Sequence, residues 1–180
     1  MPLSALDVLV TELDYGEQRL VMAVQGLSPA EMVWRAGPNT NSIAFNLWHT
    51  ARIMDRYVHR RLQDREELWV LENWEQRLPI PTAGEGGVPV GTGNGYSDQQ
   101  VSAFPALPAE DYLAYWRGVV AAVRRWLQQL PPERLEETPT QPGFQPDTTL
   151  NVLVLSLAHV HLHRGEIWNL RAAQGLKGLG

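Results

Sequence analysis

The sequence has 180 residues, 44% of them hydrophobic and 19% charged, with a formal net charge of −5. This composition is typical of a single folded globular domain, and the negative charge argues against a general electrostatic attraction to nucleic acid or to anionic membranes. Because there is no cysteine, disulfides, thiolate metal ligands and a cysteine nucleophile are excluded.

Neither the first residues nor the apolar segments carry a recognisable targeting signal. Met1 to Ser4 lack the basic region and apolar core with which a secretory signal begins. The longest apolar run, from Val152 to Val160, is interrupted by polar residues and is too short to span a bilayer. We therefore expect a cytoplasmic protein that has no membrane partner.

Helix start and stop signals divide the chain into four long helices and several short ones. Ser4 and Asp7 resemble a capping box before the first apolar stripe, which Gly26 ends. Ser28 starts a short helix, and Ser42 starts the second long one. The long helices are expected at about residues 5–25, 42–64, 109–129 and 147–175, and shorter helical segments at about 28–35, 66–77 and 97–104.

The second long helix carries His49 and a series of arginines. Apolar residues at helical spacing place His49 at the border of the buried face. Arg52, Arg56 and Arg60 repeat at intervals of four residues, which indicates a solvated face paired with nearby carboxylates. A second interpretation places Arg52 or Arg56 beside the functional site, where either would anchor an anionic substrate.

Prolines and glycines dominate residues 79–96, between the second and third long helices. The glycines do not form a phosphate-binding loop, because no Lys-Ser or Lys-Thr follows them. A loop of this length has two interpretations, either a simple surface connection or a lid or wall of a substrate site.

The main chemical signal lies in the last long helix. His159 and His163 are four residues apart, so they lie on one face of a helix and can bind one metal ion. His161 lies on the opposite side and cannot join them. A third ligand must come from elsewhere in the chain, and His49 is the best-placed candidate. The sequence therefore predicts a metal site.

Glu166, three residues after His163, returns to the same face of the helix. It is a candidate for a fourth metal ligand, for a general base, or for a hydrogen-bond acceptor that orients a ligand imidazole. The remaining two histidines, His59 and His161, are expected at the surface or at an interface.

Together these patterns predict an all-α protein, a four-helix bundle with a long loop between the second and third long helices. The expected domain is a single one over residues 1–180. The last helix is apolar nearly all round before His159, as is typical of a helix at the centre of a bundle or in a dimer interface. A homodimer is therefore expected.

Two motifs resemble the DinB/YfiT-like superfamily of metalloenzymes: the segment from Ser42 to His49, and the His-x-x-x-His-Arg-Gly-Glu run from His159 to Glu166. The similarity covers nearly the whole chain in the order of its helices. The family commonly has His-His-Arg-Gly-Gln, whereas Leu162 precedes His163 here and Glu166 stands at the glutamine position. The three positions of the metal ligands, His49 among them, are intact.

The resemblance implies a divalent metal ion, zinc or nickel, that is bound by the three histidines and has positions open to water. It also implies transfer of a low-molecular-weight thiol, of the bacillithiol or mycothiol type, to a small electrophilic substrate, with the metal-activated thiolate as nucleophile. One alternative is metal-dependent hydrolysis, with a metal-bound hydroxide and Glu166 as base. Another is a metal-binding stress-response protein without catalysis.

Overall fold

The computed structural model describes residues 3–80, 91–141 and 148–177. Throughout these ranges the secondary structure is helical and includes no strand, which confirms the all-α prediction. None of the described helices combines the length and the apolar character that crossing a membrane would require.

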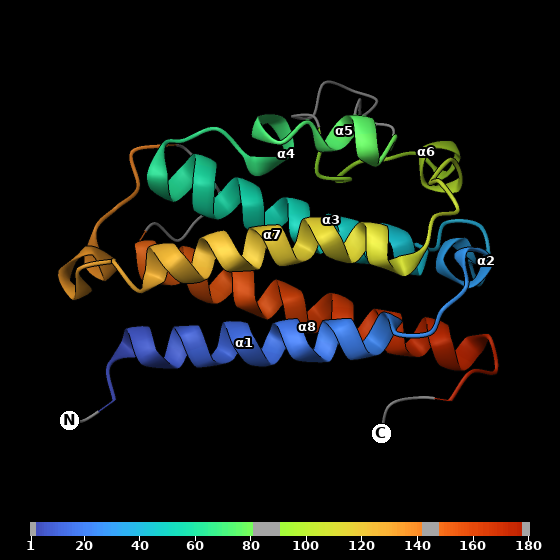
Figure 1. Cartoon of the computed structure of the whole chain (residues 1–180), viewed down its shortest axis with the longest axis horizontal. Helices are drawn as coiled ribbons and strands as arrows, with labels where there is room; N and C mark the ends of the chain where they lie inside the picture. Colours follow the sequence, from blue (N-terminus) through green and yellow to red (C-terminus); the bar gives the residue numbers. More distant parts are fainter. Residues whose placement is uncertain (1–2, 81–90, 142–147, 178–180) are drawn as a thin grey trace.

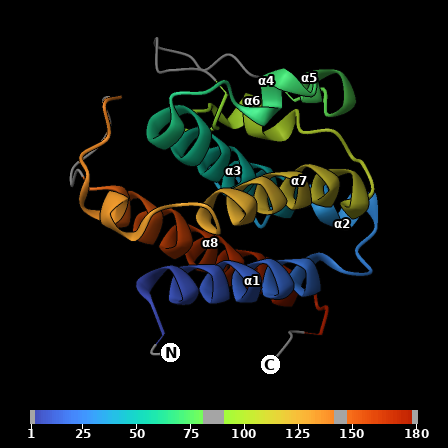
Figure 2. The ribbon, with the colours of Figure 1, turned by 60° about the vertical axis from the view of Figure 1, so that its left-hand side comes forward.

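Four long helical segments form the body of the molecule (Figure 1). They are α1 (Ala5–Val24), α3 (Ile43–Asp55) with its π-helical continuation η1 (Arg56–Leu62), α7 (Ala109–Leu127) and α8 (Thr149–Ala173). Helices α1 and α3 each pack against both α7 and α8, so the four segments surround one core. Figure 2 shows the same arrangement from another side.

The short helices α2 (Pro29–Val33), α4 (Leu68–Leu71), α5 (Trp74–Arg77), α6 (Asp98–Ser102) and the 3₁₀ segment η3 (Pro132–Glu136) connect the long ones. Helices α4 to α6 cover the side of the body opposite α1 (Figures 1 and 2). The helix expected at residues 66–77 is two pieces, because Asn73 adopts a left-handed conformation between them. The inner part of the loop predicted at residues 79–96 lies outside the described residues.

The helix starts that the capping residues predicted are confirmed. Ser4 and Ser28 form capping boxes with Asp7 and Glu31, and the Ser42 hydroxyl accepts a hydrogen bond from the Phe45 amide. Each such cap satisfies an amide that has no partner within the helix, which is worth about 1 kcal/mol. The first residues of α1 and α3 are therefore determined locally, before any tertiary contact.

Helix α8 packs closely on α1 and α3 but does not bury its whole circumference. Val160 lies so near Gly16 of α1 that a Cβ on the glycine would be 3.2 Å from its Cγ1 atom. Val154, Leu155 and Leu162 are exposed on the outer side. The nearly continuous apolar character of this helix thus reflects two different surroundings, the core and the outer surface.

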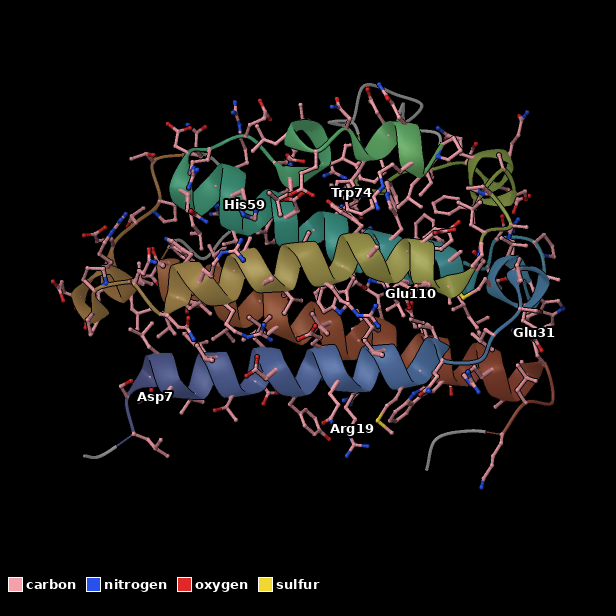
Figure 3. All side chains as sticks on the ribbon, viewed as in Figure 1. Asp7, Arg19, Glu31, His59, Trp74 and Glu110 are labelled. Carbon is pink, nitrogen blue, oxygen red and sulfur yellow. The ribbon has the colours of Figure 1, made fainter. Side chains whose placement is uncertain are left out.

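The arginine face predicted on the second long helix is wrong for Arg52, which is 3% exposed. Its guanidinium donates hydrogen bonds to Glu67 at 2.6 Å and to the Tyr115 hydroxyl at 3.1 Å, and it lies 3.4 Å from Asp55. The expected surface position of His59 is also wrong, because this residue of η1 (Figure 3) is buried and its Nδ1 lies 2.8 Å from Asp55.

Asp55 is the centre of this buried polar network. Besides its side-chain partners, its carboxylate accepts hydrogen bonds from the backbone amides of Leu68 and Trp69, both at 3.0 Å. Burial alone would raise the pKa of Asp55, but hydrogen bonds from His59 and Tyr115 outweigh that effect and the pKa lies below its ordinary value. The buried carboxylate is therefore ionised, and it fixes the start of α4 against α3.

Candidate metal centre

Three histidines meet where α3 packs against α8. His49 comes from the middle of α3, and His159 and His163 from successive turns of α8. The Nε2 atom of His159 lies 3.0 Å from that of His49 and 3.1 Å from that of His163. The structure therefore brings together the three histidines that were predicted to share a metal ion.

The spacing of these nitrogens fits one divalent ion. One potential ligand atom from each histidine lies within 4.8 Å of those from the other two, so the group could hold a metal ion. At a metal–nitrogen length of about 2.1 Å, adjacent ligand nitrogens lie about 3.0 Å apart for right-angled coordination and about 3.4 Å apart for a tetrahedron. The observed separations of 3.0 and 3.1 Å match the first arrangement and are close to the second.

The opposite ring nitrogens of two of the histidines contact oxygen acceptors. His49 Nδ1 contacts the backbone carbonyl of Thr92, and His163 Nδ1 lies 2.8 Å from Glu166 Oε2. A carbonyl or carboxylate oxygen only accepts, so each Nδ1 carries the proton and each Nε2 presents a lone pair to the shared space. Outer acceptors of this kind fix the ring orientation and the tautomer of metal-binding histidines.

Burial keeps two of the imidazoles neutral. Burial is the largest cause that lowers the pKa of His49 to about 4, against the opposing effect of its hydrogen bond to Thr92, and burial together with the nearby His163 and His49 lowers the pKa of His159 to about 3. A neutral imidazole can donate its lone pair to a metal ion, whereas an imidazolium cannot. Glu166 has a lowered pKa because it accepts the hydrogen bond from His163. At neutral pH His49 and His159 are therefore uncharged, and the Glu166 carboxylate lies beside His163.

The glycine-rich end of the long loop positions His49, a role that sequence reasoning missed. Phe45 stacks on the His49 ring, with the two ring centroids 5.5 Å apart and the planes 17° from parallel. Gly93 has a positive φ of 92°, and a Cβ on it would lie 2.8 Å from Phe45. Only glycine allows the loop to approach this closely and place the Thr92 carbonyl on His49. The repeated glycines at 91, 93 and 95 were the available signal.

Arg52 connects the buried polar network to this loop. Its Nε donates to the carbonyl of Gly91, the residue before Thr92. The guanidinium is thus occupied within the protein, while Arg56 pairs with Glu67 at 3.6 Å and keeps a side chain that is 35% exposed. An anionic substrate held by Arg52 or Arg56 stays a prediction.

His161 and Glu166, the other candidates on α8, also have defined contacts. His161 lies away from the cluster, as predicted, and its Nε2 contacts Glu12 of α1 at 2.5 Å. Glu166 contacts His163, in agreement with the interpretation that it orients a ligand imidazole, and its other two predicted roles stay open.

Glu166 also lines a pocket of about 330 Å³, whose lining contains none of the three histidines. Polar and apolar atoms contribute about equally to its surface, and its lining residues are Asn39, Thr40, Asn41, Asn46, Glu166, Asn169 and Leu170. Asn46 is one helical turn before His49 on α3, and Asn169 is one turn after Glu166 on α8. The two helices that carry the three clustered histidines therefore also form walls of this pocket.

A conserved protein from Enterococcus faecalis has a solved structure that matches with a TM-score of 0.79 at 20% identity, over 97% of this chain and 99% of that one. A DinB-like protein from Bacillus cereus ATCC 10987 matches with a TM-score of 0.60 at 16% identity, over 96% of this chain and 94% of that one. None of the curated proteins matches the sequence. The model of the DinB superfamily matches residues 12–167, and the chain belongs to this family.

Proposed function

We propose that the chain is a metal-dependent enzyme in which His49, His159 and His163 bind one divalent ion, zinc or nickel, and that it transfers a low-molecular-weight thiol to an electrophilic small molecule. One observation carries the proposal. The Nε2 atoms of the three rings converge while outer oxygens hold the Nδ1 atoms of His49 and His163. A cluster of imidazole nitrogens held in this way supports metal binding far better than it supports a role in packing.

A divalent ion with three neutral ligands keeps its full charge and lowers the pKa of a thiol that reaches it. The chain has no cysteine of its own, so the reactive sulfur must come from a cosubstrate of the bacillithiol or mycothiol type. The thiol loses its proton, its sulfur attacks an electrophilic carbon, and a carbon–sulfur bond forms as the leaving group departs. Such thiols stay reduced in the cytoplasm, where we place the activity.

Glu166 supports thiol transfer over hydrolysis. A general base for water needs a pKa close to the working pH, whereas the pKa of Glu166 lies below its ordinary value because His163 donates a hydrogen bond to it. The carboxylate therefore orients His163 and is a weak base. The side chain is still 43% exposed and could reach water, so hydrolysis is the second candidate.

The test combines a panel of thiols with a generic electrophile. Zinc- and nickel-loaded protein is incubated with bacillithiol, mycothiol, glutathione or cysteine and 1-chloro-2,4-dinitrobenzene, and conjugate formation is followed by absorbance. We expect metal-dependent conjugation with at least one thiol and its loss in His159→Ala. Hydrolysis of 4-nitrophenyl acetate without thiol-dependent conjugation would support the second candidate, and no turnover in either assay would favour a non-catalytic metal-binding protein.

A homodimer is part of the same proposal. Exposed apolar side chains gather on α8 at Val154, Leu155 and Leu162, where a second copy would cover them. Light scattering during gel filtration should give twice the chain mass for the wild type and the chain mass for Leu155→Glu/Leu162→Glu. Val70→Glu, at an exposed apolar residue of α4, is the matched control and should leave the mass unchanged.

A further inference from the structure

Arg52, one helical turn after His49 on α3, is a buried cation outside the histidine cluster. Each of its three guanidinium nitrogens has an acceptor within the protein. Nη2 donates to Glu67 at 2.6 Å, Nη1 donates to the Tyr115 hydroxyl at 3.1 Å, and Nε donates to the backbone carbonyl of Gly91. Because a guanidinium is planar and its N–H groups point in fixed directions, partners on three sides hold it in one orientation.

The contact made by Nε fixes the part of the loop that touches His49. Gly91 comes directly before Thr92, whose carbonyl oxygen contacts His49 Nδ1. Two successive carbonyls of the loop thus meet two side chains that lie three residues apart on one helix. On the other side of Thr92, Gly93 packs closely against Phe45. Thr92 is therefore held between two fixed neighbours, with its carbonyl at a defined place beside the His49 ring.

The surroundings of Arg52 make this arrangement rigid. The guanidinium lies 3.4 Å from the buried Asp55 carboxylate and 5.0 Å from the centre of the Trp69 ring. Removing one partner from a buried charge leaves that charge uncompensated, so the contacts resist separation. Glu67 precedes the first residue of α4, whereas Gly91 lies much later in the chain, and one guanidinium fastens both to α3. The loop is thus anchored to the same helix that carries His49.

We propose that Arg52 is a positioning residue of the metal centre. By holding Gly91 it places the Thr92 carbonyl on His49, which keeps the ring proton on Nδ1 and directs the lone pair of Nε2 toward the other two histidines. This inference rests on the proposed metal binding and goes beyond it, because it assigns the orientation of His49 to a residue that acts through the loop. The role differs from anchoring an anionic substrate, since the guanidinium nitrogens already have acceptors.

Arg52→Lys tests this role, because lysine keeps the positive charge but lacks the Nε group that donates to Gly91. In metal-free protein with isotope-labelled histidine, proton–nitrogen correlation spectra distinguish a protonated ring nitrogen from an unprotonated one, and His49→Gln identifies the His49 signals. We expect the Nδ1-protonated form of His49 in the wild type and a mixture of the two tautomers in Arg52→Lys. Zinc affinity, measured by competition with a chromophoric chelator, should fall about tenfold, at the lower end of the effect of losing an orienting partner.

Two controls separate positioning from a general loss of stability. Arg56→Lys changes an arginine on the next turn of the helix that pairs with the same carboxylate, Glu67, at 3.6 Å, and that makes no hydrogen bond to the described part of the loop. Tyr115→Phe removes the hydroxyl that bonds to Arg52 and leaves the contact with the loop in place, so it should lower the melting temperature. Both variants should keep the wild-type His49 signals and zinc affinity. Unchanged signals and affinity in Arg52→Lys would overturn the proposal, as would an equal change in Tyr115→Phe.

Gly91→Ala disturbs the same contact from the loop and serves if Arg52→Lys does not fold. Gly91 has a φ of 94°, and a Cβ on it would lie 3.2 Å from Arg52 Nη2. Gly26→Ala is the matched control, because Gly26 has a φ of 77° and an added Cβ would meet no atom within 4 Å. Gly91→Ala should alter the His49 signals as Arg52→Lys does, and wild-type signals in both glycine variants would refute the role. If the wild type binds no zinc, the proposed metal function fails, whereas the His49 signals still decide whether Arg52 holds the ring.

Discussion

Replacing Glu166 with Gln separates the three roles that this residue could have. The change keeps an oxygen that can accept from His163 Nδ1 and removes only the negative charge. A hydrogen bond to a charged group is worth about 1.5–3 kcal/mol and a neutral one about 0.5–1.5 kcal/mol. The difference is about 1 kcal/mol, and it must be discounted because the Glu166 side chain is 43% exposed. We therefore expect zinc affinity to fall by about fivefold or less, whereas Glu166→Ala should lower it by about 10–100-fold.

Competition with a chromophoric zinc chelator measures these affinities, and elemental analysis gives the metal content of each variant. Glu12→Gln is a close control, because Glu12 contacts His161 as Glu166 contacts His163 and is similarly exposed, at 45% against 43%. It should leave zinc affinity unchanged. Loss of all metal in Glu166→Gln would indicate a direct ligand. A fall in turnover of about 10²–10⁴-fold with metal retained would indicate a general base and would refute the orienting role.

Three further predictions follow from the contacts of the site. His49→Ala, His159→Ala and His163→Ala should each reduce the metal content well below one ion per chain in elemental analysis, whereas His161→Ala should retain the ion; full occupancy in any of the first three would remove that histidine from the site. Gly93→Ala should weaken zinc binding and lower the melting temperature, because the added Cβ would lie 2.8 Å from Phe45 and would displace the Thr92 carbonyl from His49. Gly37→Ala is the control, because a Cβ at position 37 would meet no atom within 4 Å. The metal-free protein should lose stability as the pH falls from about 6.5 to about 4. Histidines in the unfolded chain take up protons with a pKa of about 6.5, whereas folded His49 and His159 resist protonation down to about 4 and 3. The melting temperature of His49→Gln/His159→Gln should depend less on pH in this range, and an unchanged dependence would contradict the assignment.

Features that depend on residues close in sequence could be predicted from the sequence alone. Ser4, Ser28 and Ser42 mark helix starts because each cap involves an amide only three residues away. His159 and His163 share a face because the helical period sets the angle between residues four apart. His49 could be proposed as the third ligand because the apolar pattern of its helix and the family motif both placed it at a buried border.

Features that depend on how the helices pack were decided only by the tertiary structure. A series of arginines at helical spacing looks the same whether it faces water or carboxylates, and the positions of Asp55 and Glu67 around Arg52 determine that it is buried. The Thr92 carbonyl reaches His49 across 43 residues, and no local pattern specifies that contact. The pocket at Asn46 likewise exists because α3 and α8 pack together, bringing residues more than 100 positions apart to the same wall. The candidate metal-binding histidines could thus be predicted from helical spacing for His159 and His163 and from the apolar pattern and family motif for His49, whereas the acceptors that orient them arise from contacts between distant segments.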